Sequence, residues 1–380
     1  MRVGYVVGGL GRGGAELQLL HLTSGLVRRG HEAHVLAYNG PSTLDDDFRA
    51  AGVAVEAEHW PTRLAKLGAV RAWLRSTRPD VVHGVMKRAS AVTLLARLPT
   101  RRPPVVASDM STATYRARSA IMAASLVSFG LADLLVTETD LNRVNLERLG
   151  PWLRGKTVVV RNGLDTQRFS PASQAPERAD GTFRFCVVGT VYAVKNPLRV
   201  IEAVAELVRR GRHEVRVDWY GRLGLGHGEA SVQGEQAVAY ARACGVERHV
   251  VFHGDTPEIE SAYRRSDALL HASVQEGFPN AVAEGMACGL PLVVSRVADL
   301  PLVVAEAHNG YVFDETDAVA MADAMERMMA LASEERRAMG TRSRELAVRW
   351  FGMERFLDDF ETLYTALACG AAATQFTPAR

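Results

Sequence analysis

VGYVVGGLGRGGAE, residues 3–16, joins a short apolar run to a glycine-rich turn and the first residues of a helix. The run Val3–Val7 has the uninterrupted apolar character of a parallel strand that is buried on both faces. Glycines let backbone amides approach an anion closely, and the amino end of a helix adds a partial positive charge. The stretch therefore predicts an α/β fold. Its first strand ends in either a diphosphate-binding loop or a tight turn without a ligand, and five glycines between Gly8 and Gly14 favour the loop.

The same loop has the glycine spacing of a dinucleotide-binding fingerprint, at Gly9, Gly11 and Gly14. That fingerprint also needs an acidic residue near the end of the second strand, where it holds a ribose. The second apolar run of this chain ends in Tyr38-Asn39-Gly40, which contains no acid. The sequence therefore does not favour binding of NAD or FAD.

Strand and helix patterns alternate outward from this loop along the 380 residues, as in a doubly wound parallel sheet. Apolar runs typical of parallel strands occur at Val3–Val7, Ala33–Tyr38, Val81–His83, Val105–Ser108, Leu134–Thr137, Val158–Arg161, Phe183–Val188, Val215–Tyr220, Val250–His253, Ala268–Ala272 and Leu292–Ser295. The polar, proline-containing stretch Ser170–Gly181 is typical of a linker. We therefore expect two Rossmann-like domains, 1–168 and 182–350. Ligands bind at the carboxyl ends of such strands, so two facing sheets predict a cleft between the domains.

Composition restricts the function further. Hydrophobic residues make up 47% and charged residues 23%, and the net charge of +2 does not suggest a nucleic-acid partner. The four cysteines are widely spaced, which fits reduced thiols. No apolar run has the length of a signal peptide or a membrane span, so a cytoplasmic location is expected. Residues 60–78 form a basic amphipathic pattern. It predicts either a peripheral membrane contact or, as we favour, a helix that covers the sheet.

The segment SVQEGFPNAVAEGMACGLP, residues 273–291, follows a predicted strand that ends at Ala272. Gly277 and Pro279 predict a loop, and Asn280 is the expected N-cap of the helix that follows. Gly289 is expected to end that helix. Glu276 then lies in the loop and Glu284 on the helix. Carboxylates that accept hydrogen bonds, together with the amides around Phe278, suit a polyhydroxylated ligand.

This segment resembles the Glu-x7-Glu signature of the GT4 family of retaining glycosyltransferases. Four other segments resemble that family as well: Gly13–Glu16, Arg161–Asp165 with Phe169, Val188-Gly189 with Lys195-Asn196, and Ala262–Ala268. The resemblance implies the GT-B fold, with two doubly wound Rossmann-like domains facing a cleft. It also implies that a C-terminal helix, 351–368, packs back on the first domain.

The resemblance implies roles for individual residues. Lys195 would neutralise the diphosphate that leaves, Glu276 would hold hydroxyls of the donor sugar, and Glu284 would bind the nucleotide ribose. The donor-binding residues implied in this way are Gly13, Gly14, Gly189, Thr190, Lys195, Arg222, Gly277, Phe278, Pro279, Asn280 and Glu284. No metal or other cofactor is implied, because a lysine and backbone amides can supply the electrostatic stabilisation.

The chain departs from the family pattern at two places. Thr190 stands where relatives usually carry an arginine of the phosphate clamp, and Arg222 or Arg161 could replace that charge. Many relatives also carry a histidine near the reacting centre, after the fourth or fifth strand. Asp109 and His83 are the candidates here, and together with Glu276 and Lys195 they are the catalytic residues that we predict.

The predicted function is retaining transfer of a hexose or N-acetylhexosamine from a nucleoside-diphosphate sugar, such as a UDP-sugar. The acceptor would be a hydroxyl of a sugar, a glycolipid or another compound, in the synthesis of a glycan, polysaccharide or glycolipid. Two alternatives have the same architecture. One is a nucleotide-sugar 2-epimerase, and the other is a protein that binds nucleotide sugars without catalysis.

Overall fold

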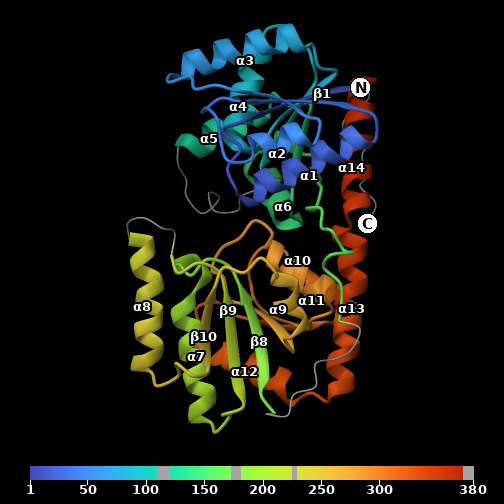
Figure 1. Ribbon diagram of the computed structural model, residues 1–380. Helices are drawn as coiled ribbons and strands as arrows, with labels where there is room; N and C mark the ends of the chain where they lie inside the picture. The colour runs from blue at the N-terminus through green and yellow to red at the C-terminus, as the bar shows by residue number, and fades with distance from the viewer. Residues whose placement is uncertain (110–119, 173–180, 225–228, 371–380) are drawn as a thin grey trace. The chain divides into compact units, whose positions relative to one another are not determined.

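The structure is a computed structural model that describes residues 1–109, 120–172, 181–224 and 229–370. The chain forms two compact units (Figure 1). Unit 1 comprises Met1–Gly163 and the C-terminal segment from Met353, and unit 2 comprises Leu164–Gly352. Residues 173–180 of the predicted linker lie outside the described residues.

Unit 1 is built on a parallel sheet whose seven described strands have the order β3-β2-β1-β4-β5-β6-β7. These strands are β1 (Arg2–Val7), β2 (Glu32–Ala37), β3 (Ala54–Ala57), β4 (Val81–Gly84), β5 (Val105–Asp109), β6 (Leu134–Thr137) and β7 (Thr157–Val159). The central strands are buried on both faces, as their continuous apolar sequences require.

Helices cover both faces of this sheet (Figure 1). One face packs against α1 (Gly14–Arg28), α2 (Asp45–Ala50) and α14 (Met353–Ala368). The other face packs against α3 (Arg63–Thr77), α4 (Met86–Arg97), α5 (Ala120–Phe129), α6 (Asp140–Leu149) and the short 3-10 helix η2 (Pro151–Leu153). Val70, Trp73 and Leu74 of α3 are buried, so α3 covers the sheet as favoured above.

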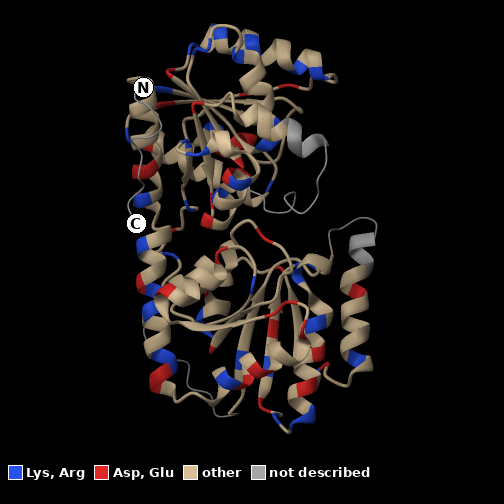
Figure 2. Ribbon diagram, turned by 180° about the vertical axis from the view of Figure 1, so that it is seen from behind, with Lys and Arg blue, Asp and Glu red and all other residues tan. Residues whose placement is uncertain are grey.

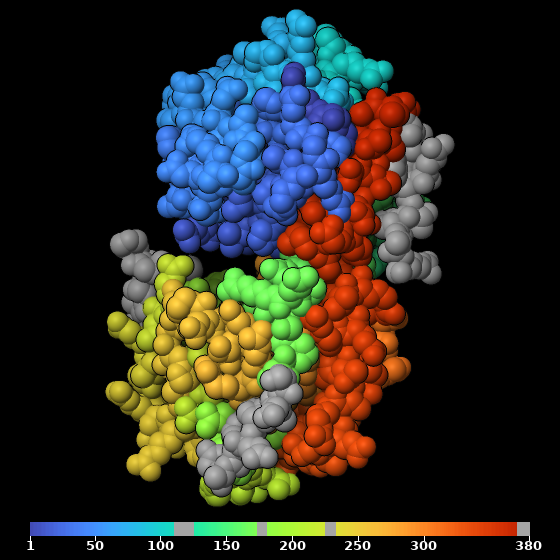
Figure 3. Space-filling model, turned by 45° about the vertical axis from the view of Figure 1, so that its right-hand side comes forward, coloured from blue at the N-terminus to red at the C-terminus, as the bar shows by residue number. Residues whose placement is uncertain are grey.

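The C-terminal helix α14 belongs to unit 1, and Figure 3 shows it in red against the blue N-terminal part of the chain. Its apolar side Phe356, Phe360, Leu363 and Tyr364 is buried, as the spacing of these residues predicts. The close approach of α1 depends on Gly25, because a Cβ there would collide with the side chain of Leu357.

Unit 2 contains a parallel sheet of six described strands in the order β10-β9-β8-β11-β12-β13. They are β8 (Phe183–Val188), β9 (Val215–Tyr220), β10 (Val250–Gly254), β11 (Ala268–His271), β12 (Leu292–Ser295) and β13 (Gly310–Phe313). The surrounding helices are η3 (Ala193–Lys195), α7 (Pro197–Arg209), α8 (Glu229–Ala243), α9 (Ile259–Arg264), α10 (Asn280–Ala287), α11 (Leu300–Ala307), α12 (Ala318–Ala330) and α13 (Ser333–Phe351). Two parallel α/β units confirm the predicted fold class.

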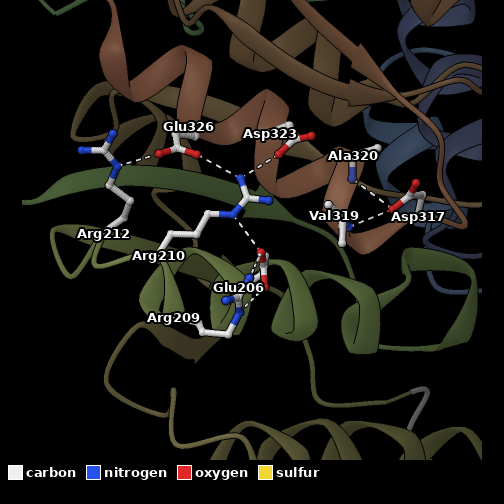
Figure 4. Close-up of polar contacts among 9 residues, drawn as sticks. All are labelled: Glu206, Arg209, Arg210, Arg212, Asp317, Val319, Ala320, Asp323 and Glu326. Carbon is white, nitrogen blue, oxygen red and sulfur yellow. Dashed lines mark hydrogen bonds and ion pairs between the residues drawn. The ribbon is translucent and has the colours of Figure 1, made fainter.

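Helices α7 and α12 pack side by side and share a network of ion pairs (Figure 4). Arg210 bridges the helices: its Nε lies 2.8 Å from Glu206, and its Nη1 lies 2.7 Å from Asp323 and 3.0 Å from Glu326. Ion pairs at an exposed surface contribute little free energy. The buried methionines Met321, Met325 and Met328 of α12 therefore carry most of the stabilisation. No helix in the described part of the chain is long and apolar enough to cross a bilayer.

Candidate functional site

In each sheet the first strand has neighbours on both sides. The chain first adds strands on one side of it and then crosses over to add the remaining strands on the other side. Ligands of doubly wound sheets bind at this crossover point, beyond the carboxyl ends of the strands. It lies between β1 and β4 in unit 1 and between β8 and β11 in unit 2. The loop after β1 contains Gly13. The loops after β8 and β11 contain Lys195 and Glu276. The topology of each sheet therefore places these predicted residues where a ligand is expected.

The turn after β8 brings Lys195 back over the strand end. Gly189 has a φ of +142°, in the region that favours glycine, and a Cβ at Gly189 would lie 2.9 Å from Cε of Lys195. Asn196 then fixes the end of the turn, since its side-chain amide donates to the carbonyl oxygens of Ala272 (3.2 Å) and Glu315 (2.8 Å). The turn that carries Lys195 is thus tied to the loop after β11.

A second glycine, Gly221 directly after β9, determines how closely the turn at Gly189 can approach the end of β9. Its φ is +140°, and a Cβ there would collide with the carbonyl oxygen of Gly189. The peptide of Gly189 also donates to Tyr220 O and accepts from Trp219 Nε1, at 2.9 and 2.8 Å. Residue 221 therefore has to be glycine for the turn at Gly189 to keep its position.

Lys195 and Glu276 form a close ion pair, with 2.6 Å between Lys195 Nζ and Glu276 Oε1. His271 is the last residue of β11 and is 3% exposed. Its Nε2 lies 3.4 Å from the same oxygen of Glu276. The structure therefore brings a lysine, a carboxylate and an imidazole together at the ligand-binding edge of unit 2. Within the described residues, no three His, Cys, Asp or Glu side chains are placed to ligate a metal ion.

The charges of this group follow from its surroundings. Burial alone raises the pKa of Glu276, but the adjacent imidazole of His271 and the charge of Lys195 outweigh it and lower the pKa to about 2. Burial lowers the pKa of His271, with a further contribution from Lys195, and the opposing effect of Glu276 does not restore it. At neutral pH the site therefore holds an ionised Glu276 beside a neutral His271.

Glu284 lies one turn into α10 and is held by a different partner. Its Oε2 accepts a hydrogen bond of 2.7 Å from the hydroxyl of Tyr263, a fully buried residue of α9. Burial raises the pKa of Glu284, although the bond from Tyr263 opposes the rise. The hydroxyl of Tyr263 thus binds one oxygen of Glu284 and fixes the orientation of the carboxylate.

The loop between the two glutamates packs into the core through Phe278. Phe278 is 6% exposed, and 4.8 Å separates the centroid of its ring from that of Phe351. The expectation that Asn280 caps α10 is wrong, because Pro279 holds the N-cap position and Asn280 is the first helical residue. The fixed φ of proline, −75° here, favours this start. Gly289, with a φ of +81°, follows the end of α10 as predicted.

The arginines considered as replacements for the missing clamp residue already have carboxylate partners. Arg222 Nε lies 3.1 Å from Asp255 Oδ2 and its side chain is 71% exposed. Arg161, in unit 1, lies 2.8 Å from Asp140 Oδ2. Thr190 is partly buried beside Gly189. Lys195 is also paired with a carboxylate, but its side chain lies directly over Gly189 and is 18% exposed.

In unit 1, Gly13 is the N-cap of α1 and Gly14 is its first residue. A Cβ at Gly13 would collide with the carboxylate of Glu16, which lies against the amino end of the helix. Because Gly13 has no side chain, the carboxylate of Glu16 can lie directly against the main chain of the loop.

The other two catalytic candidates lie in the interior of unit 1. Asp109 ends β5, is 1% exposed and pairs with Lys87 at 3.4 Å. His83 is 1% exposed, and its Nδ1 is 2.7 Å from the hydroxyl of Tyr364. Burial lowers the pKa of His83 to about 3. Because aromatic rings of Tyr5, Phe360 and Tyr364 surround His83, we leave it out of the proposed site.

Sequence reasoning did not identify His271 as a site residue. The residue ends an otherwise apolar strand, Ala268–His271, directly before the carboxylate segment. A polar residue at that place is the only indication in the sequence, and a core histidine would look the same. The contact between His271 and Glu276 depends on how the loop folds, and the spacing of the residues in the sequence does not predict that.

Two family models match successive parts of the chain. "Glycosyltransferase Family 4" matches residues 12–168, and "Glycosyl transferases group 1" matches residues 170–346. The chain belongs to the GT4 glycosyltransferases. Curated relatives of this GT4 protein include D-inositol 3-phosphate glycosyltransferase of Corynebacterium jeikeium, 32% identical over 55% of this chain and 52% of the relative. Another is N-acetyl-alpha-D-glucosaminyl L-malate synthase of Bacillus anthracis, 32% identical over 31% of each chain.

The GT4 chain spans about half the length of the first curated relatives it matches. Solved structures resemble it over nearly all of its length. Anabaena Alr3699/HepE, crystallised with UDP, has a TM-score of 0.82 and 18% identity over 96% of this chain and 100% of that one. At this identity the similarity shows the fold, and it confirms the GT-B architecture.

Proposed function

We propose that this GT4 protein transfers a sugar from a nucleoside-diphosphate sugar to an acceptor hydroxyl, with retention of anomeric configuration and without a metal cofactor. The observation that carries this proposal is the group formed by Lys195, Glu276 and the turn at Gly189, at the ligand-binding edge of unit 2. HepE was crystallised with UDP and with UDP-glucose, which makes UDP-sugars the first donors to test.

In this mechanism the ammonium of Lys195 faces the diphosphate, whose negative charge grows as the glycosidic bond breaks. A fixed charge in a partly buried site stabilises such a transition state strongly. Ionised Glu276 accepts hydrogen bonds from hydroxyls of the donor sugar, and Glu284 accepts them from the ribose. The acceptor oxygen attacks the face that the phosphate leaves, and a departing phosphate oxygen takes the acceptor proton.

Incubation with UDP-glucose and a panel of hydroxyl acceptors tests the proposal, with NMR of the product as the readout. We expect a glycoside with the anomeric configuration of the donor and release of UDP. An inverted product would overturn retention. An epimerised donor formed without acceptor would indicate the isomerase, and donor binding without turnover would indicate a binding protein.

Glu284→Ala should weaken binding of UDP, whereas Glu276→Ala should leave UDP affinity near the wild-type value and lower turnover. A lost hydrogen bond to a charged group corresponds to a change of roughly tenfold to a hundredfold in Kd. Calorimetric titration with UDP and steady-state turnover measure the two effects separately. Equal loss of UDP affinity in both variants would contradict this division of roles.

Turnover should persist in EDTA, because Lys195 and backbone amides supply the positive charge in the proposed mechanism. The assay compares the initial rate after dialysis against EDTA with the rate after readdition of Mn²⁺ or Mg²⁺. A rate that vanishes with the chelator and returns with either ion would show that the mechanism needs a metal.

A further inference from the structure

The chain leaves unit 1 at Gly163 and returns to it at Met353. The two points are neighbours in unit 1, because a Cβ at Gly163 would lie 3.0 Å from Met353 Sδ. The same Cβ would collide with the ring of Phe356 in α14, the helix that lies alongside α1 (Figure 1). The absence of a side chain at Gly163 therefore lets the departing main chain pass close to α14.

Gln18 of α1 binds both polar groups of the main chain at this point. Gln18 Nε2 donates to Gly163 O at 3.0 Å, and Gly163 N donates to Gln18 Oε1 at 2.9 Å. Gln18 is 7% exposed, and both hydrogen bonds are buried. Buried main-chain groups without partners are unfavourable, so the carboxamide holds Gly163 against α1.

A residue of α14 holds the same segment of main chain. Arg355 Nη2 donates at 3.3 Å to the carbonyl oxygen of Arg161, two residues before Gly163, and Arg355 Nη1 pairs with Asp359 at 3.1 Å. Acidic and basic residues are distributed along α13 and α14 (Figure 2). The contact of Gly163 with α1, by contrast, joins uncharged groups, so protonation does not alter it near neutral pH.

Gln18 lies one turn along α1 from Gly14, the first residue of that helix. Residues four apart in a helix share a face, so Gln18 lies on the same face as the end of the glycine-rich loop. The resemblance assigns this loop of unit 1 to the donor, and it assigns Lys195 of unit 2 to the same donor. The proposed reaction therefore needs both units, and the course of the chain where it leaves unit 1 matters for turnover.

We propose that Gln18 is a positioning residue for sugar transfer, because its carboxamide fixes the main chain at Gly163, where the chain leaves unit 1. This inference rests on the proposed function and adds a residue that acts through Gly163. A carboxamide suits this role, since it donates one hydrogen bond and accepts another, as the peptide group opposite does. An ionised carboxylate at the same position could only accept.

Gln18→Glu tests the inference through the pH dependence of turnover. The ionised carboxylate would repel Gly163 O, whereas the protonated carboxyl again offers one donor and one acceptor. Burial raises the pKa of a carboxyl above its usual value of about 4.3. We expect a kcat about tenfold to a hundredfold below the wild-type value at about pH 8, because small misplacements have effects of this size. The ratio to wild type should rise as the pH falls and the carboxyl takes up its proton.

Two further variants complete the experiment, each shown by circular dichroism to be folded. Gln18→Met removes both hydrogen bonds and should lower kcat at every pH. Gln236→Glu is the matched control, because Gln236 is an exposed glutamine of α8, and its ratio to wild type should not change with pH. Calorimetric affinity for UDP should be unchanged in all three variants, since Lys195 and Glu284 belong to unit 2.

Wild-type kcat in Gln18→Met, or the same pH profile for Gln18→Glu and Gln236→Glu, would overturn the proposal. Hydrogen exchange at the Gly163 amide tests the contact without turnover. We expect faster exchange in Gln18→Met than in the wild type, and equal rates would also overturn the proposal. A wild-type protein that shows this difference but transfers no sugar would reject the proposed function and retain the fixed position of Gly163.

Discussion

Lys195→Ala should lower turnover by about 10²–10³, with a much smaller effect on affinity for the donor. The ammonium is fixed over the turn at Gly189 and faces a leaving group whose charge grows in the transition state. Interactions that strengthen in the transition state increase the rate more than the affinity. Thr190 supplies no charge where an arginine is usual in the family, so Lys195 should carry more of the stabilisation. Comparison of turnover with calorimetric UDP affinity measures both effects.

Thr190→Arg is the companion variant for this experiment. We expect it to fold, to keep its turnover and to bind the donor more tightly, because residue 190 is only partly buried beside Gly189. If Lys195→Ala folds and retains near wild-type turnover, Lys195 does not stabilise the leaving group and the proposed mechanism loses its main positive charge.

Phe360→Ala should lower the stability of unit 1 by about 3–5 kcal/mol, the usual cost of removing a buried phenylalanine ring. Phe360 is 2% exposed and contacts the rings of Phe356 and Tyr364, at 5.1 and 5.5 Å between centroids. Urea denaturation monitored by circular dichroism measures the loss.

The control is Thr365→Ala, an exposed position on the same helix. It should change the unfolding free energy by less than about 0.5 kcal/mol. Similar losses for Phe360→Ala and Thr365→Ala would mean that α14 adds little to the core of unit 1.

The buried strands could be predicted from the sequence, but two strands at sheet edges could not. β3 and β13 each occupy an edge of their sheet, and their residues are mostly half-buried or exposed. Prediction of parallel strands depends on a continuous apolar run, which burial on both faces produces. An edge strand such as Ala54–Ala57 has no need of that run and does not show it.

The residues of the candidate sites divide in a similar way. Glu276 and Glu284 belong to one continuous segment, so their spacing could be recognised without a structure. Lys195 and His271 belong to two different strand ends, and they meet at Glu276 only because β8 and β11 are adjacent in the sheet. The order of strands in a sheet cannot be read from the sequence, and His271 was therefore missed.

The assignment of α14 to unit 1 has a consequence for synthesis of the protein. The ribosome completes residues 1–163 before any residue of α14 exists, and Leu164–Gly352 must be translated in between. At about 5–20 residues per second this interval lasts roughly 10–40 s. Throughout it, the apolar face formed by residues such as Leu22, Leu26 and Val81 lacks its final cover. We therefore expect the nascent chain to expose this apolar face to chaperones until α14 has been synthesised.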